Sequence, residues 1–308
     1  MTDADNRTYR DFLGPRYWHT WLGLGIAWLI GRLPMRATWL IGSAPGELLC
    51  ALYGSRRHIA YTNVSRCFPE LSVHEHHRLV RAHFRALGQA LLDSSIAWWS
   101  SPARLRRLVS WHGREHYDRA VAAGHHVIVL VPHWIGIEIT GLRLSMEIPI
   151  VDVYRRPVND LLALVIERNR TRFKGKLIEH IRGLVPVIKT LNAGNPLLYV
   201  PDQDPGLRSS SFVPFFGIQA ATFNVLGRIT TMTNSVVIPC IFRQLPRGAG
   251  YEIVFKPPLE NFPTGDVIAD TARMNRVIEE CVREVPEQYF WVHKRFKTRP
   301  EGEGKFYT

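Results

Sequence analysis

Two apolar stretches near the N-terminus are the first pattern in this sequence. The first, residues 17–31 (YWHTWLGLGIAWLIG), is almost entirely apolar and lies between Arg16 and Arg32. As a helix it would extend about 22 Å, whereas the hydrocarbon core of a bilayer is about 30 Å thick. Trp18, Trp21 and Trp28, near its ends, favour a membrane interface, because tryptophan concentrates at that depth.

The second stretch, residues 37–53, is interrupted by polar and turn-forming residues and makes a poor membrane-spanning helix. The first stretch could span a bilayer with its flanks, lie in the interface, or pair with the second as a hairpin. Such a hairpin could also be buried within a soluble protein. The tryptophans lead us to expect membrane association, and we treat residues 1–54 as an N-terminal membrane-anchoring segment.

From residue 55 onward the pattern is first helical and then alternates between strands and helices. Apolar residues recur at three- and four-residue steps over 55–99, with a break at Pro69. Strands are predicted at 126–131, 148–153, 197–200, 236–242 and 251–255, and helices at 160–172 and 269–285. This alternation predicts an α/β fold in which helices flank a single central mixed sheet.

Composition and charge narrow the classes of protein and partner. Hydrophobic residues make up 46% and charged residues 21% of the 308, as in a folded chain with a core. The net charge of +12 indicates an anionic partner, which could be nucleic acid, anionic lipid or an acidic protein. The four cysteines are scattered, so we expect a reducing compartment and neither a disulfide framework nor a structural zinc site.

The strongest candidate for a catalytic site is the sequence VIVLVPHWIGIE. It places His133 directly after the strand at 126–131 and Glu138 five residues later, and α/β folds bind ligands where strands end. If a helix starts near Gly136, Glu138 could accept the proton on one ring nitrogen and leave the other free as a general base. The alternative is a structural histidine that caps a helix beside an unrelated glutamate.

No motif for a nucleophile or a phosphate-binding loop accompanies this pair. The sequence contains no GxSxG, no GxGxxG after a strand, no P-loop and no HExxH. His112 and His116 are spaced as helical metal ligands but lie in a polar, irregular stretch, so we expect no metal site. A base without an evident nucleophile indicates direct transfer onto an acceptor hydroxyl, with no covalent enzyme intermediate.

Three further charged segments are candidates for binding. Arg155 follows a predicted strand, and a basic run comprises Arg168, Arg170 and Arg172. Guanidinium groups suit phosphates and carboxylates, although such a run is also typical of a solvated helix face.

Asp202 and Asp204 lie in the loop PDQDPG after the strand at 197–200. They could bind a cation, or hold the loop through Asx-type hydrogen bonds, the role that we favour. Residues 288–297 (QYFWVHKRFK) join aromatic and basic side chains. They could stack on RNA, contact a membrane or an acidic carrier protein, or pack into the core as a last strand.

Together these motifs resemble the bacterial lipid A biosynthesis acyltransferases, late acyltransferases that use acyl carrier protein thioesters. The matching segments are CFPELS (67–72), HxxxxE (133–138), VYR (153–155), RxRxR (168–172), PDQDPG (201–206), FVPFFG (212–217) and PEQYFWVHKRFKTRPEGE (286–303). They occur in the family's order over nearly the whole chain. The wider glycerolipid acyltransferases share a related histidine–acid box but carry an FPEGTRS-like block, where this sequence has PDQDPGLRSS.

The resemblance implies that a fatty acyl group, laurate or similar, passes from acyl carrier protein to Kdo2-lipid IVA or its monoacylated product. The acceptor would be a hydroxyl of a 3-hydroxyacyl chain. In this reading residues 55–308 form the catalytic domain, His133 is the general base, Glu138 is its partner, and Arg155 contacts substrate or oxyanion. We assign Arg168, Arg170, Arg172, Asp202 and Asp204 to substrate binding, and expect Lys294, Arg295 and Lys297 to help recruit the two anionic substrates.

The implied location is the bacterial inner membrane, with the catalytic domain on the cytoplasmic side, no cofactor and no nucleic acid partner. Two alternatives remain open. One is an acyltransferase for another amphiphile, such as a lysophospholipid or an ornithine lipid. The other is a non-catalytic, membrane-attached RNA- or lipid-binding protein, which would leave His133 and Glu138 at a strand end unexplained.

Overall fold

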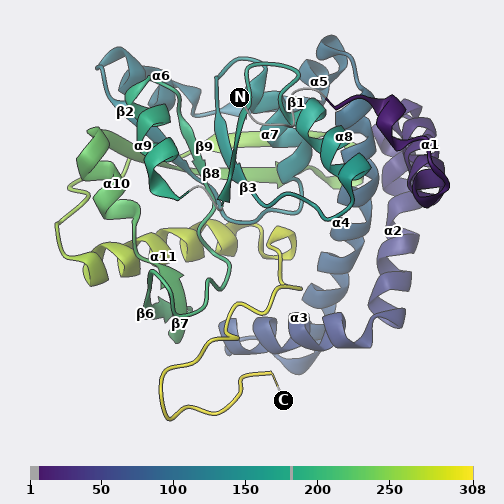
Figure 1. The fold of residues 1–308 in the computed structure, drawn as a ribbon. Coiled ribbons are helices and arrows are strands. Elements are labelled where there is room, and N and C mark those ends of the chain that lie inside the picture. Colours follow the sequence, from purple (N-terminus) through teal and green to yellow (C-terminus); the bar gives the residue numbers. More distant parts are fainter. Residues whose placement is uncertain (1–6, 181–182, 308) are drawn as a thin grey trace.

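The computed structural model describes residues 7–180 and 183–307 and contains a seven-stranded sheet flanked by helices (Figure 1). In spatial order the strands are β1 (Val109–His112), β9 (Tyr251–Phe255), β8 (Ser235–Gln244), β2 (His126–Leu130), β5 (Leu197–Tyr199), β3 (Val151–Tyr154) and β4 (Lys176–Glu179). Neighbouring strands are parallel except β8 and β9, which are antiparallel. The predicted central mixed sheet is confirmed.

The helices precede, connect and follow the strands. They are α1 (Trp18–Arg32), α2 (Met35–Leu52), α3 (Gly54–Cys67), α4 (Val73–Trp99), α5 (Pro102–Leu108), α6 (Arg114–Ala122), α7 (Ile137–Ser145), α8 (Asp160–Arg170), α9 (Leu184–Asn192), α10 (Leu226–Thr233) and α11 (Val267–Glu284). Short 3-10 turns occur at η2 (Tyr9–Phe12), η3 (Pro15–Tyr17), η5 (Pro246–Gly248) and η6 (Pro286–Gln288). A separate antiparallel hairpin, β6 (Ser210–Phe215) with β7 (Ile218–Phe223), contacts α11.

Local sequence explains the two elements that matter most for the site. After His126, β2 consists of four consecutive apolar residues, of which Ile128 and Val129 are 0% exposed, as expected for a parallel strand covered on both faces. α4 begins at a capping box: Glu75 accepts the backbone N–H of Ser72, and the Ser72 hydroxyl accepts the N–H of Glu75. The long helix α4 then contacts α1, α2, α3 and α7.

Most of the predicted elements are present, with shifted ends. The strand expected at 148–153 forms only from Val151 to Tyr154, whereas the strand at 251–255 is found as predicted. β1, β4 and the β6–β7 hairpin were not predicted; β1 and β4 are short and partly exposed, so they lack the continuous apolar run that marks β2.

The two N-terminal helices, α1 and α2, each pack on α4 rather than along each other, and both leave apolar side chains exposed (Figure 1). Close packing of α2 is possible because Gly42 and Gly46 face Gly88 of α4: a Cβ added at Gly88 would lie 2.4 Å from the Gly42 carbonyl oxygen. The exposed side carries Trp18, Leu22, Ile26 and Leu29 on α1, and Leu40, Ile41, Leu48 and Leu52 on α2. No helix within the described residues is long and apolar enough to cross a bilayer.

Candidate active site

His133 and Asp202 form a close polar pair at the carboxyl edge of the sheet. Nδ1 of His133 lies 2.6 Å from Oδ1 of Asp202, and the backbone N–H of His133 donates to Oδ2 at 2.9 Å. The Asp202 carboxyl is 1% exposed, whereas the His133 side chain is 27% exposed. Nδ1–H therefore points inward to the carboxylate, and Nε2 is bonded by no other residue of the described chain.

The register of two strands brings this pair together. β2 and β5 are parallel neighbours in which Leu130 pairs with Tyr199. His133 and Asp202 each follow three residues after their paired strand residue, and the N–H of Val131 donates to the Tyr199 carbonyl to extend the ladder. Two loops leaving adjacent strands at the same level consequently face each other.

The C-terminal segment completes the surroundings of His133. The N–H of Phe290 donates to the His133 carbonyl at 3.0 Å, and Trp134 forms an isolated bridge with Tyr289. Burial would raise the pKa of Asp202, but His133 and the Tyr289 hydroxyl bind its carboxylate and lower that pKa on balance. Asp202 is thus held as the charged form that an imidazole N–H prefers as acceptor.

A second histidine, His293, lies in the same small cavity as His133. Burial and the charge of His133 lower the pKa of His293 to about 4, so its ring is neutral at pH 7. Its Nε2 accepts the backbone N–H of Asp204 at 3.1 Å. Asp204 also accepts from Gly206 N–H and from both the N–H and the hydroxyl of Thr298. The contacts of Asp204 are thus the Asx-type loop bonds, and they tie this loop to the C-terminal segment.

Glu138 has partners other than His133, which corrects the pairing expected from the sequence. Oε2 of Glu138 lies 2.6 Å from Nη2 of Arg170, and Oε1 accepts the indole N–H of Trp98 at 2.9 Å. Arg170 also donates to Asp152 at 2.8 Å. The reason is the placement of α7, whose first turn carries Glu138 and which contacts α4 and α8, the helices that carry Trp98 and Arg170.

The network of Glu138, Arg170 and Asp152 nevertheless lies close enough to His133 to interact with it electrostatically. Burial raises the pKa of Asp152, Arg170 lowers it, and the charges of both Glu138 and His133 act on the same carboxyl. Arg170, which is half-buried, has its pKa raised because the two carboxylates outweigh the effect of burial. The network therefore fixes α7, α8 and β3 against one another beside His133.

The arginines that we assigned to a basic binding surface are mostly engaged within the fold. Arg172 donates to the carbonyls of Ala97, Trp98 and Ser100, which lie at the end of α4 and need donors. Arg168 is exposed but donates to the Arg7 carbonyl and lies over the Tyr9 ring. The expectation that the 168–172 run is free for a partner is therefore corrected.

Arg155 differs from these arginines. It is exposed directly after β3, at the sheet edge where His133 lies, and its side chain has no partner within the described residues. Lys294 and Lys297 are also exposed, and Lys294 contacts only the Tyr307 ring in the described chain. These three cations, and not the 168–172 run, are available to anionic partners.

The aromatic residues of the C-terminal strip lie in the core. Tyr289, Trp291 and Phe296 are 4%, 1% and 0% exposed, and Arg295 is 2% exposed, donating to the Ala221 carbonyl and to Thr222. They form no strand, yet they pack inward as that alternative expected, which leaves these rings unable to stack on bases. Arg295 is likewise unable to recruit a partner at the surface, which corrects the role expected for it.

His112 and His116, whose spacing suited metal ligands, do not lie in a common cluster. His112 pairs with Glu252 from β9, and His116 lies near Arg119 of its own helix. Among residues 7–180 and 183–307, no three His, Cys, Asp or Glu side chains meet as a metal ion requires.

Comparison with known proteins decides the family. Residues 7–298 match the profile described as bacterial lipid A biosynthesis acyltransferase. The chain belongs to this family. Its similarity to individual relatives covers nearly all of both chains: the lipid A biosynthesis lauroyltransferase of Escherichia coli (strain K12) is 35% identical over 291 residues, 94% of this chain and 95% of the relative.

Two further relatives from the same organism show that the likeness is not confined to one acyl specificity. The lipid A biosynthesis palmitoleoyltransferase is 34% identical over 301 residues, 97% of each chain. The lipid A biosynthesis myristoyltransferase is 30% identical over 295 residues, 96% of this chain and 91% of the relative. Membership in the family makes this chain an acyltransferase of lipid A biosynthesis.

Sequence reasoning located His133 but not the partner of its Nδ1. The available signal was that His133 and Asp202 both follow strand ends; what the sequence does not show is that β2 and β5 are neighbours, since β3 and β4 lie between them in the chain.

Proposed function

We propose that this protein transfers a fatty acyl group, laurate or a chain of similar length, from acyl carrier protein to Kdo2-lipid IVA or its monoacylated product. The acceptor is a hydroxyl of a 3-hydroxyacyl chain, and His133 is the general base. The observation that supports this most directly is the pairing of His133 with Asp202, which holds Nδ1 and leaves Nε2 open. The names of the relatives support the lipid A substrate.

The chemistry follows from the two ring nitrogens. Nε2 removes the proton of the acceptor hydroxyl as the oxygen attacks the thioester carbonyl carbon, and Asp202 stabilises the imidazolium that forms. When the tetrahedral intermediate collapses, the carbon–sulfur bond breaks and the leaving thiolate receives the proton from Nε2. The histidine is regenerated, and no bond to the enzyme forms at any step.

Glu138 takes a different part in this proposal. Its carboxylate is already bonded by Arg170 and Trp98, so it holds the first turn of α7 against α4 and α8. We propose that Glu138 thereby sets the geometry of the loop between itself and His133. Arg155, exposed at the same edge, is the residue placed to meet the phosphorylated acceptor or the developing oxyanion.

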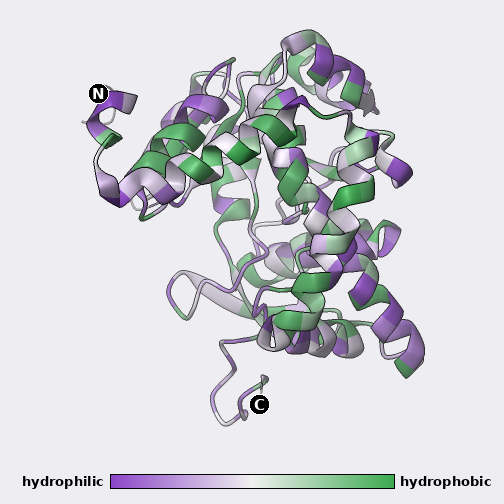
Figure 2. Cartoon of the chain, turned by 90° about the vertical axis from the view of Figure 1, so that its right-hand side faces the viewer, coloured by the Kyte–Doolittle hydropathy of each residue, from purple (hydrophilic) through white to green (hydrophobic). Residues whose placement is uncertain are grey.

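We further propose that the exposed faces of α1 and α2 lie in the inner-membrane interface, with the catalytic domain on the cytoplasmic side. Trp18, Leu22, Ile26 and Leu29 follow one another at three- and four-residue steps, so they form one exposed face of α1. Exposed arginines at both ends, Arg16 and Arg32, suit anionic head groups. Figure 2 shows this side of the molecule with its hydrophobic bands. An interfacial position would place the site near a lipid acceptor and a cytosolic donor.

Mass spectrometry of lipid A tests the function as a whole. The gene is supplied to a host without its own late acyltransferases, and the wild type should add one secondary acyl chain while His133→Ala adds none. Identity to the lauroyl and palmitoleoyl relatives differs by one percentage point, 35% against 34%. The purified protein is therefore given both acyl carrier protein thioesters, and a strong preference for palmitoleate would contradict the laurate proposal. Unchanged lipid A in cells that contain the folded protein would contradict lipid A as the acceptor.

A further inference from the structure

A chain of buried hydrogen bonds connects α2 to the loop that carries His133. It starts at Thr38 of α2, whose hydroxyl lies 2.9 Å from Oδ1 of Asp93 on α4. Oδ2 of Asp93 accepts the Tyr251 hydroxyl at 2.8 Å. Thr38, Asp93 and Tyr251 are each 0% exposed, so water does not replace any of these bonds in the folded protein.

Tyr251 touches the His133 loop directly through its ring. A Cβ added at Gly136 would lie 2.5 Å from Cε1 of Tyr251, so the ring rests against the glycine backbone. Gly136 is the residue before α7 and lies between His133 and Glu138. A residue with a side chain at this position would have to displace the ring or the loop.

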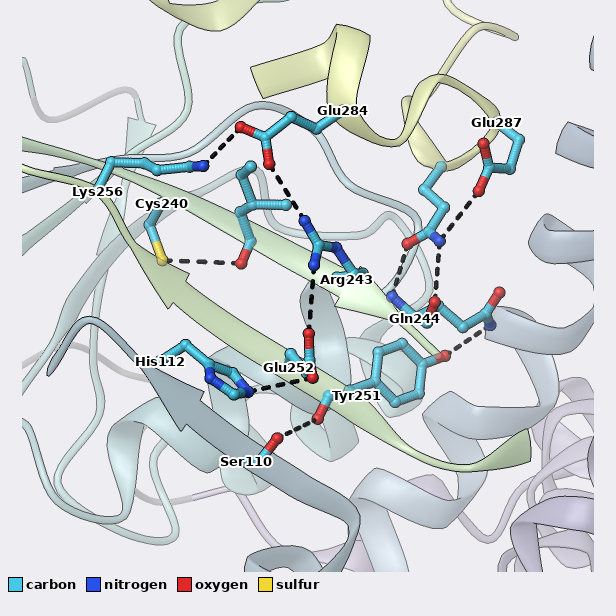
Figure 3. Close-up of polar contacts among 12 residues, drawn as sticks. Ser110, His112, Cys240, Arg243, Gln244, Tyr251, Glu252, Lys256, Glu284 and Glu287 are labelled. Atoms are coloured by element: carbon cyan, nitrogen blue, oxygen red, sulfur yellow. Dashed lines mark hydrogen bonds and ion pairs between the residues drawn. The ribbon is translucent and has the colours of Figure 1, made fainter. Parts of the chain in front are cut away.

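A second route runs from Tyr251 through two glutamines. Figure 3 shows the Tyr251 hydroxyl facing the side-chain amide of Gln244, which donates to it at 2.9 Å. The backbone of Gln244 exchanges two hydrogen bonds with the side chain of Gln288, at 2.6 and 2.9 Å. The carbonyl of Gln288 then accepts the N–H of Ile135 at 3.0 Å. Both routes end within three residues of His133.

We propose that Tyr251, fixed by Asp93 and Thr38, is a positioning residue for acyl transfer: it holds Ile135 and Gly136, and through them His133. In this proposal Thr38, Asp93 and Tyr251 do not contact the reacting atoms. They act by setting the position of the loop, and α2 thereby becomes part of the active-site scaffold. The expected effect on acyl transfer rests on the proposed function, whereas the expected effect on the position of the loop is independent of it.

Two substitutions break the chain at different links. Thr38→Val removes the hydroxyl that joins α2 to Asp93, and Tyr251→Phe keeps the ring against Gly136 but removes its hydroxyl. Each should lower kcat about 10-fold or more and leave the KM of both substrates within about twofold, because a displaced base slows the chemical step. Thr38→Ser, which retains the hydroxyl, should restore kcat.

Hydrogen exchange gives a readout that needs no acyl transfer. The N–H groups of residues 134–137 should exchange about 10-fold faster in Thr38→Val and Tyr251→Phe than in the wild type. Thr230→Val is the matched control, because this buried threonine on α10 donates to the Leu226 carbonyl of its own helix and to nothing else described. It should lower thermal stability without changing exchange in the loop or kcat.

The outcomes separate this inference from the proposed function. If the wild type forms no acylated product, the proposed function fails, and loop exchange still decides the inference. If Thr38→Val and Tyr251→Phe keep wild-type exchange at 134–137 and lose only thermal stability, as the control does, the network is structural and the inference is overturned. A loss of kcat without faster exchange contradicts it as well, because the loop would not have moved.

Discussion

Asp202 binds His133 at two points, with Oδ1 2.6 Å from Nδ1 and Oδ2 accepting the backbone N–H at 2.9 Å. Contacts to both ring and backbone fix the orientation of the imidazole as well as its tautomer. His133 and His293 border the same small cavity. In this arrangement the aspartate, rather than the glutamate of the same motif, is the group that can support proton transfer.

Asp202→Asn should therefore lower kcat about 10²- to 10⁴-fold, the range that general-base catalysis contributes. The amide cannot serve the ring N–H and the backbone N–H together as acceptor, so tautomer and orientation are both compromised. The double variant with His133→Ala should be scarcely slower than His133→Ala alone, because the two residues act as a unit. If Asp202→Asn keeps the wild-type kcat, Asp202 is not the carboxylate that supports His133, and Glu138 would again be the candidate.

Glu138→Gln should keep more activity than Asp202→Asn but lose stability. Arg170 would retain only Asp152 as an anionic partner, and a hydrogen bond between charged groups contributes about 1.5–3 kcal/mol. The expected measurements are a lower urea midpoint and a kcat within about 10-fold of the wild type. Equal stability combined with complete loss of activity would instead show Glu138 acting directly in the reaction.

Charged residues on the exposed face of α1 should weaken binding to lipid vesicles. Leu22→Glu with Ile26→Glu removes two side chains whose burial contributes roughly 1.5–3 kcal/mol each. Sedimentation with anionic vesicles should show the partition constant falling about 100-fold or more. Val121→Glu is the control, since this exposed residue lies on α6, away from α1 and α2 (Figure 1). Unchanged sedimentation of the double variant would contradict an interfacial position of α1.

Asp93 should make stability depend on pH in a defined direction. Burial raises the pKa of Asp93 from 3.8 to about 6, against the lowering effect of its hydrogen bonds to Tyr251, Thr38 and Gln89. The folded state binds this proton more tightly, so its contribution to stability is complete below about pH 4 and is lost as pH rises through about 6. Two units correspond to roughly 3 kcal/mol.

Asp93→Asn isolates that contribution. The Thr38 hydroxyl has one proton and two neighbours, the Met35 carbonyl at 2.8 Å and Asp93 at 2.9 Å. When the Thr38 hydroxyl donates its proton to the Met35 carbonyl, its oxygen can only accept a hydrogen bond from residue 93. An asparagine amide or a protonated aspartate can donate that bond. In urea unfolding, the stability of Asp93→Asn relative to the wild type should increase from pH 4 to pH 7. A stability difference that stays constant over this range would refute the raised pKa of Asp93.

Charge reversal at the exposed cations should affect binding more than turnover. Lys294→Glu with Lys297→Glu should raise the KM for acyl carrier protein several-fold at low salt, and the effect should shrink as salt screens charges over about 8 Å. Arg155→Ala should act on the lipid acceptor instead. Lys174→Glu, on an exposed residue elsewhere, is the control. Unchanged KM values at low salt would mean that these cations are merely solvated.

The sequence could predict helices and strands but not which strands lie next to each other in the sheet. Strands such as β2 are marked by a continuous apolar run, and Gly136 was correctly placed before a helix. The pairing of His133 with Asp202 depends on strand order, which no local pattern contains. Arg170 and Arg172 were misjudged for a related reason: α8 ends at Arg170, so the alternating basic run leaves the helix and turns inward to the end of α4.

The close contact between α2 and α4 bears on how the protein can be handled without detergent. Removing α1 and α2 would uncover Gly88 and leave the Asp93 carboxyl without Thr38, so a shortened chain should aggregate or lose its active loop. Polar substitutions at the exposed Leu22, Ile26 and Leu48 leave the inner face of α2 unchanged. The exposed faces of the two helices can thus be redesigned while the faces that pack on α4 continue to support the enzyme.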